Sequence, residues 1–234
     1  IAMERTVVPE NFSFRMTDEE YRVLEKIKNS IPVCYLADHA DFALGIVTGN
    51  NKKFLSAEKT EHSEMVLKGT DICKYHINPA KQYLWFEPEQ FQQVAPLEIY
   101  RAPEKLLYRF ISNQLVVAYD DRQMLSLNSC NIVIPKIEGM QIKYILAILN
   151  SSVSQFVYQK EFHSIKVLRA HMEHIPIPRV GKAIQNEIIA MTEPLICGMG
   201  KEAAETCQKR LDCRIMDLFR LSAEEQWIIR HALH

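Results

Sequence analysis

The stretch Gln141-Ile-Lys-Tyr-Ile-Leu-Ala-Ile-Leu-Asn-Ser-Ser-Val-Ser-Gln-Phe156 marks a change of pattern along the chain. Its apolar residues recur at intervals of three and four residues from Ile142 to Phe156. This spacing places them on one face of a helix, because an α-helix completes a turn about every 3.6 residues. The stretch therefore predicts one amphipathic helix over residues 141–156, with its apolar face packed inward.

Upstream of this helix the sequence is typical of β-strands. Short runs rich in β-branched and aromatic residues are bounded by Gly, Pro, Asn or Asp, as expected for strands joined by turns. The predicted strands are Val33–Leu36, Leu44–Val47, Glu64–Leu67, Tyr83–Phe86, Leu115–Tyr119 and Asn131–Ile134. Residues 104–111 fit either a strand or a short helix, and residues 48–53 have the polar composition of a loop.

Helical patterns lie at both ends of the chain. Thr17 and Glu20 have the spacing of a capping box, which predicts a helix that ends near Ser30. Ser222 and Glu225 have the same spacing before the last apolar run. Between them, Pro194 interrupts a helical stripe and predicts a kink or a break, since proline removes a backbone donor.

These elements together predict an α+β (mixed α/β) fold. Residues 1–178 are expected to form a body with a mixed β-sheet, in which residues 167–172 form a helical turn or two and residues 175–178 are extended. Residues 179–234 are expected to form a C-terminal helical segment that packs on this body or on a partner domain.

Composition narrows the class of protein. The chain has 234 residues, of which 47% are hydrophobic and 24% charged, as in ordinary globular domains. Its net charge of −1 argues against a protein that is basic throughout, but a nucleic-acid reader needs positive charge only on the facing surface. The six cysteines include no Cys-x-x-Cys pair, which favours reduced thiols in a cytoplasmic protein.

The ends and the hydropathy of the chain give two further expectations. No stretch approaches the roughly 18 consecutive apolar residues of a membrane span, so no membrane association is expected. The first residue is Ile1 rather than Met, which suggests a fragment whose catalytic part lies elsewhere in a parent protein.

The sequence offers little for catalysis. It contains no Gly-x-Gly-x-x-Gly, no phosphate-binding loop of the Gly-x-x-x-x-Gly-Lys-Ser/Thr type and no Gly-x-Ser-x-Gly. His171 and His174 could share a helix face as metal ligands, but a third ligand is not apparent and a surface pair is the better interpretation. Asp120 and Asp121 are better explained by a turn after a strand, because adjacent strand residues point to opposite faces. We therefore predict no catalytic residues and no metal in this chain.

Six elements in order resemble the TaqI-like C-terminal specificity domain of restriction-modification adenine methyltransferases. The first, Leu44-Gly-Ile-Val-Thr-Gly-Asn-Asn-Lys-Lys-Phe-Leu55, is similar to the family's Gly-Ile-x-Thr-Gly-x-Asn-x-x-Phe pattern. Tyr144-Ile-Leu-Ala-Ile-Leu-Asn-Ser151 is similar to its Tyr-Leu-Leu-Ala-Leu-Leu-Asn-Ser helix. The other four are Leu67–Tyr75, Arg101–Arg109 with Val117–Asp120, His174–Pro178 and Leu211–Glu225. Pro103-Glu-Lys105 departs from the family's Pro-Lys by one inserted residue.

The resemblance implies a target-recognition domain that reads double-stranded DNA in the major groove. A methyltransferase domain of the same parent chain would bind S-adenosylmethionine and flip out and methylate the adenine, so the cofactor site lies outside this chain. For phosphate contacts we expect Thr48, Asn50, Asn51, Lys52, Lys53, Lys68, Lys74, Arg101, Lys105 and Arg109. For base reading we expect Arg122, Gln123, Ser126, Asn128 and Ser129, which lie in a polar stretch between two predicted strands. Gly45, Gly49 and Gly69 are expected to serve turn geometry.

Two other functions remain open at this point. A type I restriction specificity subunit, or a fragment of one, would read DNA in the same way but assemble with different partners. A protein-interaction module without DNA binding would agree with the near-neutral charge.

Overall fold

A four-stranded antiparallel sheet lies at the centre of the structure, a computed structural model that describes residues 16–162 and 164–233. Its strands lie in the order β2 (Ala40–Ala43), β9 (Cys130–Pro135), β6 (Lys105–Arg109) and β7 (Val117–Asp120). Side chains alternate between its faces along each strand. Leu106 therefore packs into one hydrophobic cluster and Leu107 into another. Both faces of the sheet are buried, which explains why its strands are apolar almost throughout.

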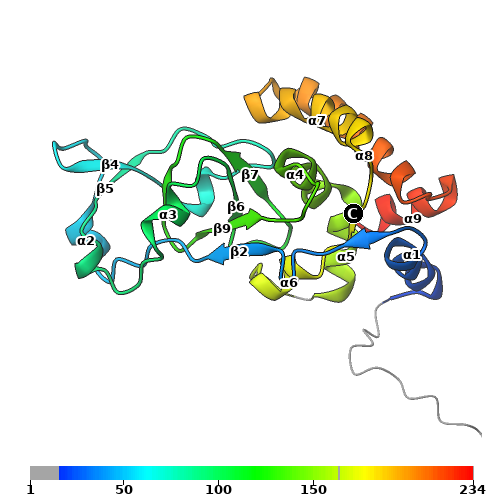
Figure 1. Cartoon of the computed structure of the whole chain (residues 1–234), viewed down its shortest axis with the longest axis horizontal. Helices are drawn as coiled ribbons and strands as arrows, with labels where there is room; N and C mark the ends of the chain where they lie inside the picture. The colour runs from blue at the N-terminus through cyan, green and yellow to red at the C-terminus, as the bar shows by residue number, and fades with distance from the viewer. Residues whose placement is uncertain (1–15, 163, 234) are drawn as a thin grey trace, which may run out of the picture.

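A second four-stranded sheet extends the molecule away from the helices, at the end that carries β4 and β5 (Figure 1). Its strands lie in the order β3 (Leu55–Ser56), β5 (Gln82–Trp85), β4 (Ser63–Leu67) and β8 (Leu125–Ser126). The first three are antiparallel, and β8 pairs with β4 in parallel. Short helical turns surround this sheet: α2 (Asn51–Phe54), η1 (Gly69–Asp71), η2 (Pro88–Gln90) and α3 (Leu97–Tyr100).

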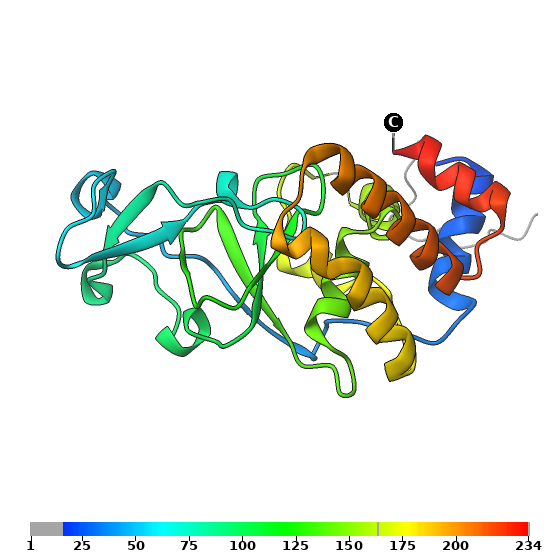
Figure 2. The same ribbon diagram turned by 90° about the horizontal axis from the view of Figure 1, so that it is seen from above.

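The remaining helices gather at the other end of the molecule (Figures 1 and 2). They are α1 (Asp18–Asn29), α4 (Ile142–Asn150), α5 (Ser152–Glu161), α6 (Arg169–Glu173), α7 (Lys182–Cys197), α8 (Lys201–Leu218) and α9 (Ala223–Ala232). A pair of two-residue strands, β1 (Val33–Cys34) and β10 (Ile177–Pro178), joins the start of the chain to the segment before α7. Helices α1 and α9 lie side by side, and Lys26 forms an ion pair with Glu225 between them.

The fold confirms the predicted α+β class and most of its elements. Thr17 and Ser222 both cap helices in complete capping boxes, as predicted. Residues 104–111, which fitted two structures, form strand β6. The boundary at residue 178 stays a prediction. Helices α7, α8 and α9 contribute Ile188, Leu211 and Ile229 to the same hydrophobic cluster as α4 and α5.

Three local predictions are wrong. The single helix over residues 141–156 is two helices, because Ser151 accepts a hydrogen bond from Ser154 N and starts a new helix as its N-cap. Of the two effects predicted for Pro194, the break is wrong, because Pro194 lies in the last turn of a continuous helix that packs against α4 and α8, and the kink stays a prediction. The loop over residues 48–53 contains one helical turn, capped by Asn50.

The strand predicted at Leu44–Val47 lies earlier in the chain, at Ala40–Ala43. Beyond it, Ile46 and Val47 form only isolated bridges. The cause is the close approach of Gly45 to another segment: a Cβ on Gly45 would lie 2.0 Å from the carbonyl oxygen of Leu127.

Two buried side-chain amides join the helices to β7 and to the residues just before it. Asn150, at the end of α4, accepts a hydrogen bond from Val117 N at 3.1 Å and donates one to Val117 O at 2.8 Å. Gln155, in α5, makes the same pair of bonds with the backbone of Leu115, both at 2.9 Å. The amides thus satisfy backbone groups that a further strand would otherwise pair.

No helix in the described parts of the chain is both long and apolar enough to cross a lipid bilayer.

We predict that Asn150→Ala lowers the free energy of unfolding by about 2 kcal/mol, because it leaves the buried N–H of Val117 without its partner. Urea unfolding measures this change. Asn113→Ala, at an exposed position, is the matched control and should change stability by less than about 0.5 kcal/mol. An equal effect of the two substitutions would contradict the role assigned to Asn150.

Candidate nucleic-acid interface

Backbone contacts bring the polar segments predicted from the sequence to one side of the second sheet. Ile46 N donates to Ser126 O at 2.7 Å, and Asn128 N donates to Ile46 O at 3.1 Å. Leu127 N in turn donates to Leu67 O at 2.8 Å. The segments around residues 46–53, 66–69 and 122–129 are therefore neighbours, although they are far apart in the sequence. We call these three segments the polar edge.

The first segment forms a small hydrogen-bonded cap. Thr48 is buried and donates from Oγ1 to Asn51 Oδ1 at 2.6 Å, while it accepts from Asn50 N at 3.2 Å. Asn50 Oδ1 accepts from Lys53 N at 3.2 Å and so caps α2. Asn50, Asn51, Lys52 and Lys53 are exposed at the surface, whereas Thr48 holds the loop from inside.

The turn between β7 and β8 presents three exposed polar side chains, Asp121, Arg122 and Gln123. Asp120 is buried and accepts hydrogen bonds from Arg122 N and Met124 N, both at 2.9 Å. Gln123 has φ = +57°, a left-handed conformation that costs energy in residues other than glycine. Arg101 donates to Gln123 O at 2.7 Å and holds the turn from outside. Such strain persists only where surrounding contacts impose it, and it is frequent at functional sites.

Lys105 does not reach the surface. Its side chain is 0% exposed, and its ammonium lies 2.5 Å from Asp120 Oδ2 and donates to Tyr100 O at 2.6 Å. Burial lowers the pKa of Lys105, and the hydrogen bond and the charge of Asp120 oppose this effect. The prediction that Lys105 contacts phosphate is therefore wrong, because the whole positive charge is committed to an interior ion pair.

Three other predicted phosphate contacts are also engaged within the protein. Arg109 donates to Gly69 O and Ile72 O, and Arg101 forms a bidentate ion pair with Glu64 at 2.6 and 2.7 Å. Lys74 is half-buried and donates to Asn150 O at 3.4 Å. Burial lowers its pKa, and the nearby carboxylate of Asp212 opposes this. These cations brace the loops, and only part of each side chain remains open to a ligand.

Gly45 and Gly69 are required for close approach between segments and not for turn geometry, which corrects the prediction made for them. A Cβ on Gly69 would lie 2.5 Å from Ser129 O, and one on Gly45 would lie 2.7 Å from Cys130 O. Gly49 alone has the positive φ, +73°, of the predicted turn. Two of the three glycines therefore allow the polar edge to pack against residues 127–130.

The structure divides the predicted contacts by exposure. Those at the surface are Asn50, Asn51, Lys52, Lys53, Arg122, Gln123 and Asn128. Lys68 and Ser129 are half-buried, and the hydroxyl of Ser129 accepts from Gly69 N at 2.9 Å. Ser126 is fully buried, so its side chain cannot read a base in this conformation.

Of the two histidines His171 and His174, the first has a structural role. His171 accepts from Leu168 N at 3.2 Å through Nδ1 and stacks on Phe162, with ring centroids 4.4 Å apart. Burial lowers the pKa of His171. His174 is exposed and contacts Ala170 O through Nδ1 at 2.6 Å. Among the described residues, no group of three or more His, Cys, Asp or Glu side chains is arranged to hold a metal ion.

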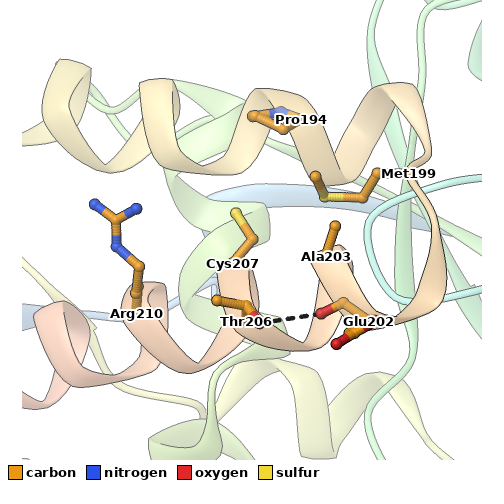
Figure 3. A pocket seen from close by; sticks show the side chains of 7 residues that line it. All are labelled: Pro194, Met199, Glu202, Ala203, Thr206, Cys207 and Arg210. Atoms are coloured by element: carbon orange, nitrogen blue, oxygen red, sulfur yellow. Dashed lines mark hydrogen bonds between the residues drawn. The ribbon is translucent and has the colours of Figure 1, made fainter.

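A shallow pocket of about 480 Å³ lies on the opposite part of the molecule, between α7 and α8 (Figure 3). Pro194, Met199 and Ala203 line its apolar wall, with Glu202 and Arg210 at its two ends. Cys207 donates from Sγ to Met191 O at 3.3 Å, and Thr206 donates to Glu202 O at 3.1 Å. The pocket is apolar and remote from the polar edge, so it adds no group to the candidate interface.

Residues 64–177 match the TaqI-like C-terminal specificity domain family. This part of the chain is similar to that specificity domain. The matched range includes the second and third segments of the polar edge, and the loop over residues 48–53 precedes it. No curated protein sequence matches the chain.

Solved structures of restriction-modification proteins resemble this chain. The type IIL restriction-modification enzyme MmeI, in complex with DNA, has a TM-score of 0.56 and 10% identity, over 84% of this chain and 35% of MmeI. The HsdS subunit from Thermoanaerobacter tengcongensis has a TM-score of 0.44 and 14% identity, over 92% of this chain and 50% of HsdS. The type IIG restriction endonuclease BpuSI has a TM-score of 0.46 and 10% identity, over 87% of this chain and 33% of BpuSI. The chain thus spans half the length of these proteins or less, and the likeness to MmeI extends the shared fold beyond the matched range.

We predict that Lys105→Met lowers the free energy of unfolding of this chain by about 3–5 kcal/mol, because it leaves the buried carboxylate of Asp120 without its cation. Chemical denaturation measures the loss. The control is Lys81→Met, which removes an exposed lysine. A loss under about 1 kcal/mol for Lys105→Met would show that the ion pair does not support the turn at residues 120–124.

Proposed function

We propose that this chain is the sequence-specific DNA-recognition module of a restriction-modification enzyme and carries no catalytic centre. The observation that supports this most strongly is the match of residues 64–177 to the TaqI-like specificity domain. The exposed cations and amides of the polar edge agree with it, since phosphate and base edges are bound by these side chains. MmeI, which shares the fold, was solved in complex with DNA.

The exposed residues divide by the chemistry that they can perform. Lys52 and Lys53 lie in the helical turn α2, which Asn50 caps, and can bind phosphates, which position a protein on DNA without reading sequence. Arg122, Gln123 and Asn128 have the side chains that read bases in the major groove, where Arg pairs with guanine and Asn or Gln pairs with adenine. The backbone of Gln123 is held by its own turn, so little backbone freedom is lost when its side chain meets a base.

We further propose that the parent protein is a type II or type IIG adenine-N6 DNA methyltransferase, with or without an endonuclease. Its methyltransferase domain would bind S-adenosylmethionine and methylate a flipped adenine, and this chain would place that domain at its target. A second TaqI-like specificity domain in the parent would instead indicate a type I specificity subunit. The sequence of the complete parent gene distinguishes the two.

We predict that this chain binds random-sequence duplex DNA with an affinity that falls steeply between about 50 and 200 mM salt, because phosphate contacts release counterions. Lys52→Gln should weaken binding to all sequences alike and lower the salt slope by about one. Lys201→Gln, on the exposed surface of α8, is the matched control and should change neither quantity.

An affinity that does not depend on salt would contradict phosphate binding by this chain. Absence of DNA binding at low salt, both by the chain and by its complete parent, would favour a protein-interaction module instead.

A further inference from the structure

Four backbone segments lie side by side where the polar edge ends, and two of them, residues 68–69 and 129, belong to it. Gly69 N donates to Ser129 Oγ, and Phe110 N donates to Ser129 O at 3.0 Å. Residues 110–112 then pair with residues 165–167, where Val167 N donates to Phe110 O at 2.8 Å and Ser112 N donates to Ile165 O at 2.9 Å. We call residues 68–69, 109–112, 129 and 164–168 the basic strip.

The basic strip has an unusual charge composition for a chain with a net charge of −1. The strip itself contains Lys68, Arg109 and Lys166 and no Asp or Glu. Two carboxylates close to it in the sequence are already engaged within the protein. Asp71 is buried and accepts from Lys68 N, and Glu173 is bonded to Arg169 at 2.7 Å. The strip therefore presents a surplus of positive charge.

Apolar side chains are exposed beside these cations. Ile111 is 52% exposed and Ile165 is 71% exposed, and Leu168 is also at the surface. Ile111 lies directly opposite Lys166 in an antiparallel bridge, so the two side chains project from the same face. Lys166 is itself exposed, and Val167, the next residue, is buried and anchors this segment.

We infer that the basic strip is a second DNA contact of this chain, in which Lys166 binds a phosphate and Ile111 contacts a groove. The inference rests on the proposed function and adds residues to it. DNA fits the strip because its own residues include three cations and no Asp or Glu, and because Gly69 and Ser129, which are bonded to each other, make it continuous with the polar edge. Apolar side chains commonly contact thymine methyl groups or wedge into a groove beside phosphate-binding cations. A protein partner would not require a surface whose charged residues are all cations.

The test compares Lys166→Gln and Ile111→Ser with the wild-type chain in titrations with random-sequence duplex DNA across salt. Lys166→Gln should weaken binding about three- to tenfold and lower the salt slope by about one. Ile111→Ser should weaken binding without changing the salt slope, since it removes no charge. Lys201→Gln and Met199→Ser, both exposed near the start of α8, are the matched controls. Unchanged unfolding midpoints show that each variant is folded.

The outcomes separate this inference from the proposed function. If Lys52→Gln weakens binding but Lys166→Gln and Ile111→Ser do not, the basic strip is not a DNA contact and the proposed function stands. If the wild-type chain and its complete parent bind no DNA, both are overturned.

Discussion

The buried ion pair between Lys105 and Asp120 is the contact on which the candidate interface depends. Asp120 ends strand β7, and its two carboxylate oxygens bind the Lys105 ammonium and the backbone N–H groups of Arg122 and Met124. One carboxylate thus fixes the turn that presents Arg122 and directs the chain into β8. Because β8 pairs with β4, the same contact couples the central sheet to the second sheet.

The same ion pair shows the limit of sequence reasoning. The strands and capping boxes could be predicted because apolar period and cap spacing are local properties. The role of Lys105 could not be predicted, because a lysine is nearly always at the surface. Its partner, Asp120, lies fifteen residues later in the sequence. The apolar pattern does not reveal the break at Ser151, because the apolar stripe continues on both sides of this residue. The hydroxyl of Ser151 nevertheless caps the second helix.

The chain is nearly neutral, yet its cations are unevenly placed. Lys105 is buried, and Arg101 is paired with Glu64 at the surface of the second sheet. Lys52, Lys53 and Arg122 are exposed on the polar edge. Net charge counts all of these equally, which explains why composition alone could not decide between a DNA reader and a protein-interaction module. The sequence alone does not single out Lys166. Only the fold places it beside residues 110–112, opposite Ile111.

DNA reading by the polar edge is tested most directly by the base preference of the chain, measured by selecting bound duplexes from a random library with the wild type, Arg122→Ala and Asn128→Ala. We expect each substitution to remove preference at one or two base pairs and to leave the other positions unchanged, whereas Asn186→Ala, at an exposed position of α7, should leave the whole preference intact. If neither Arg122→Ala nor Asn128→Ala changes the selected sequence, the polar edge does not read DNA.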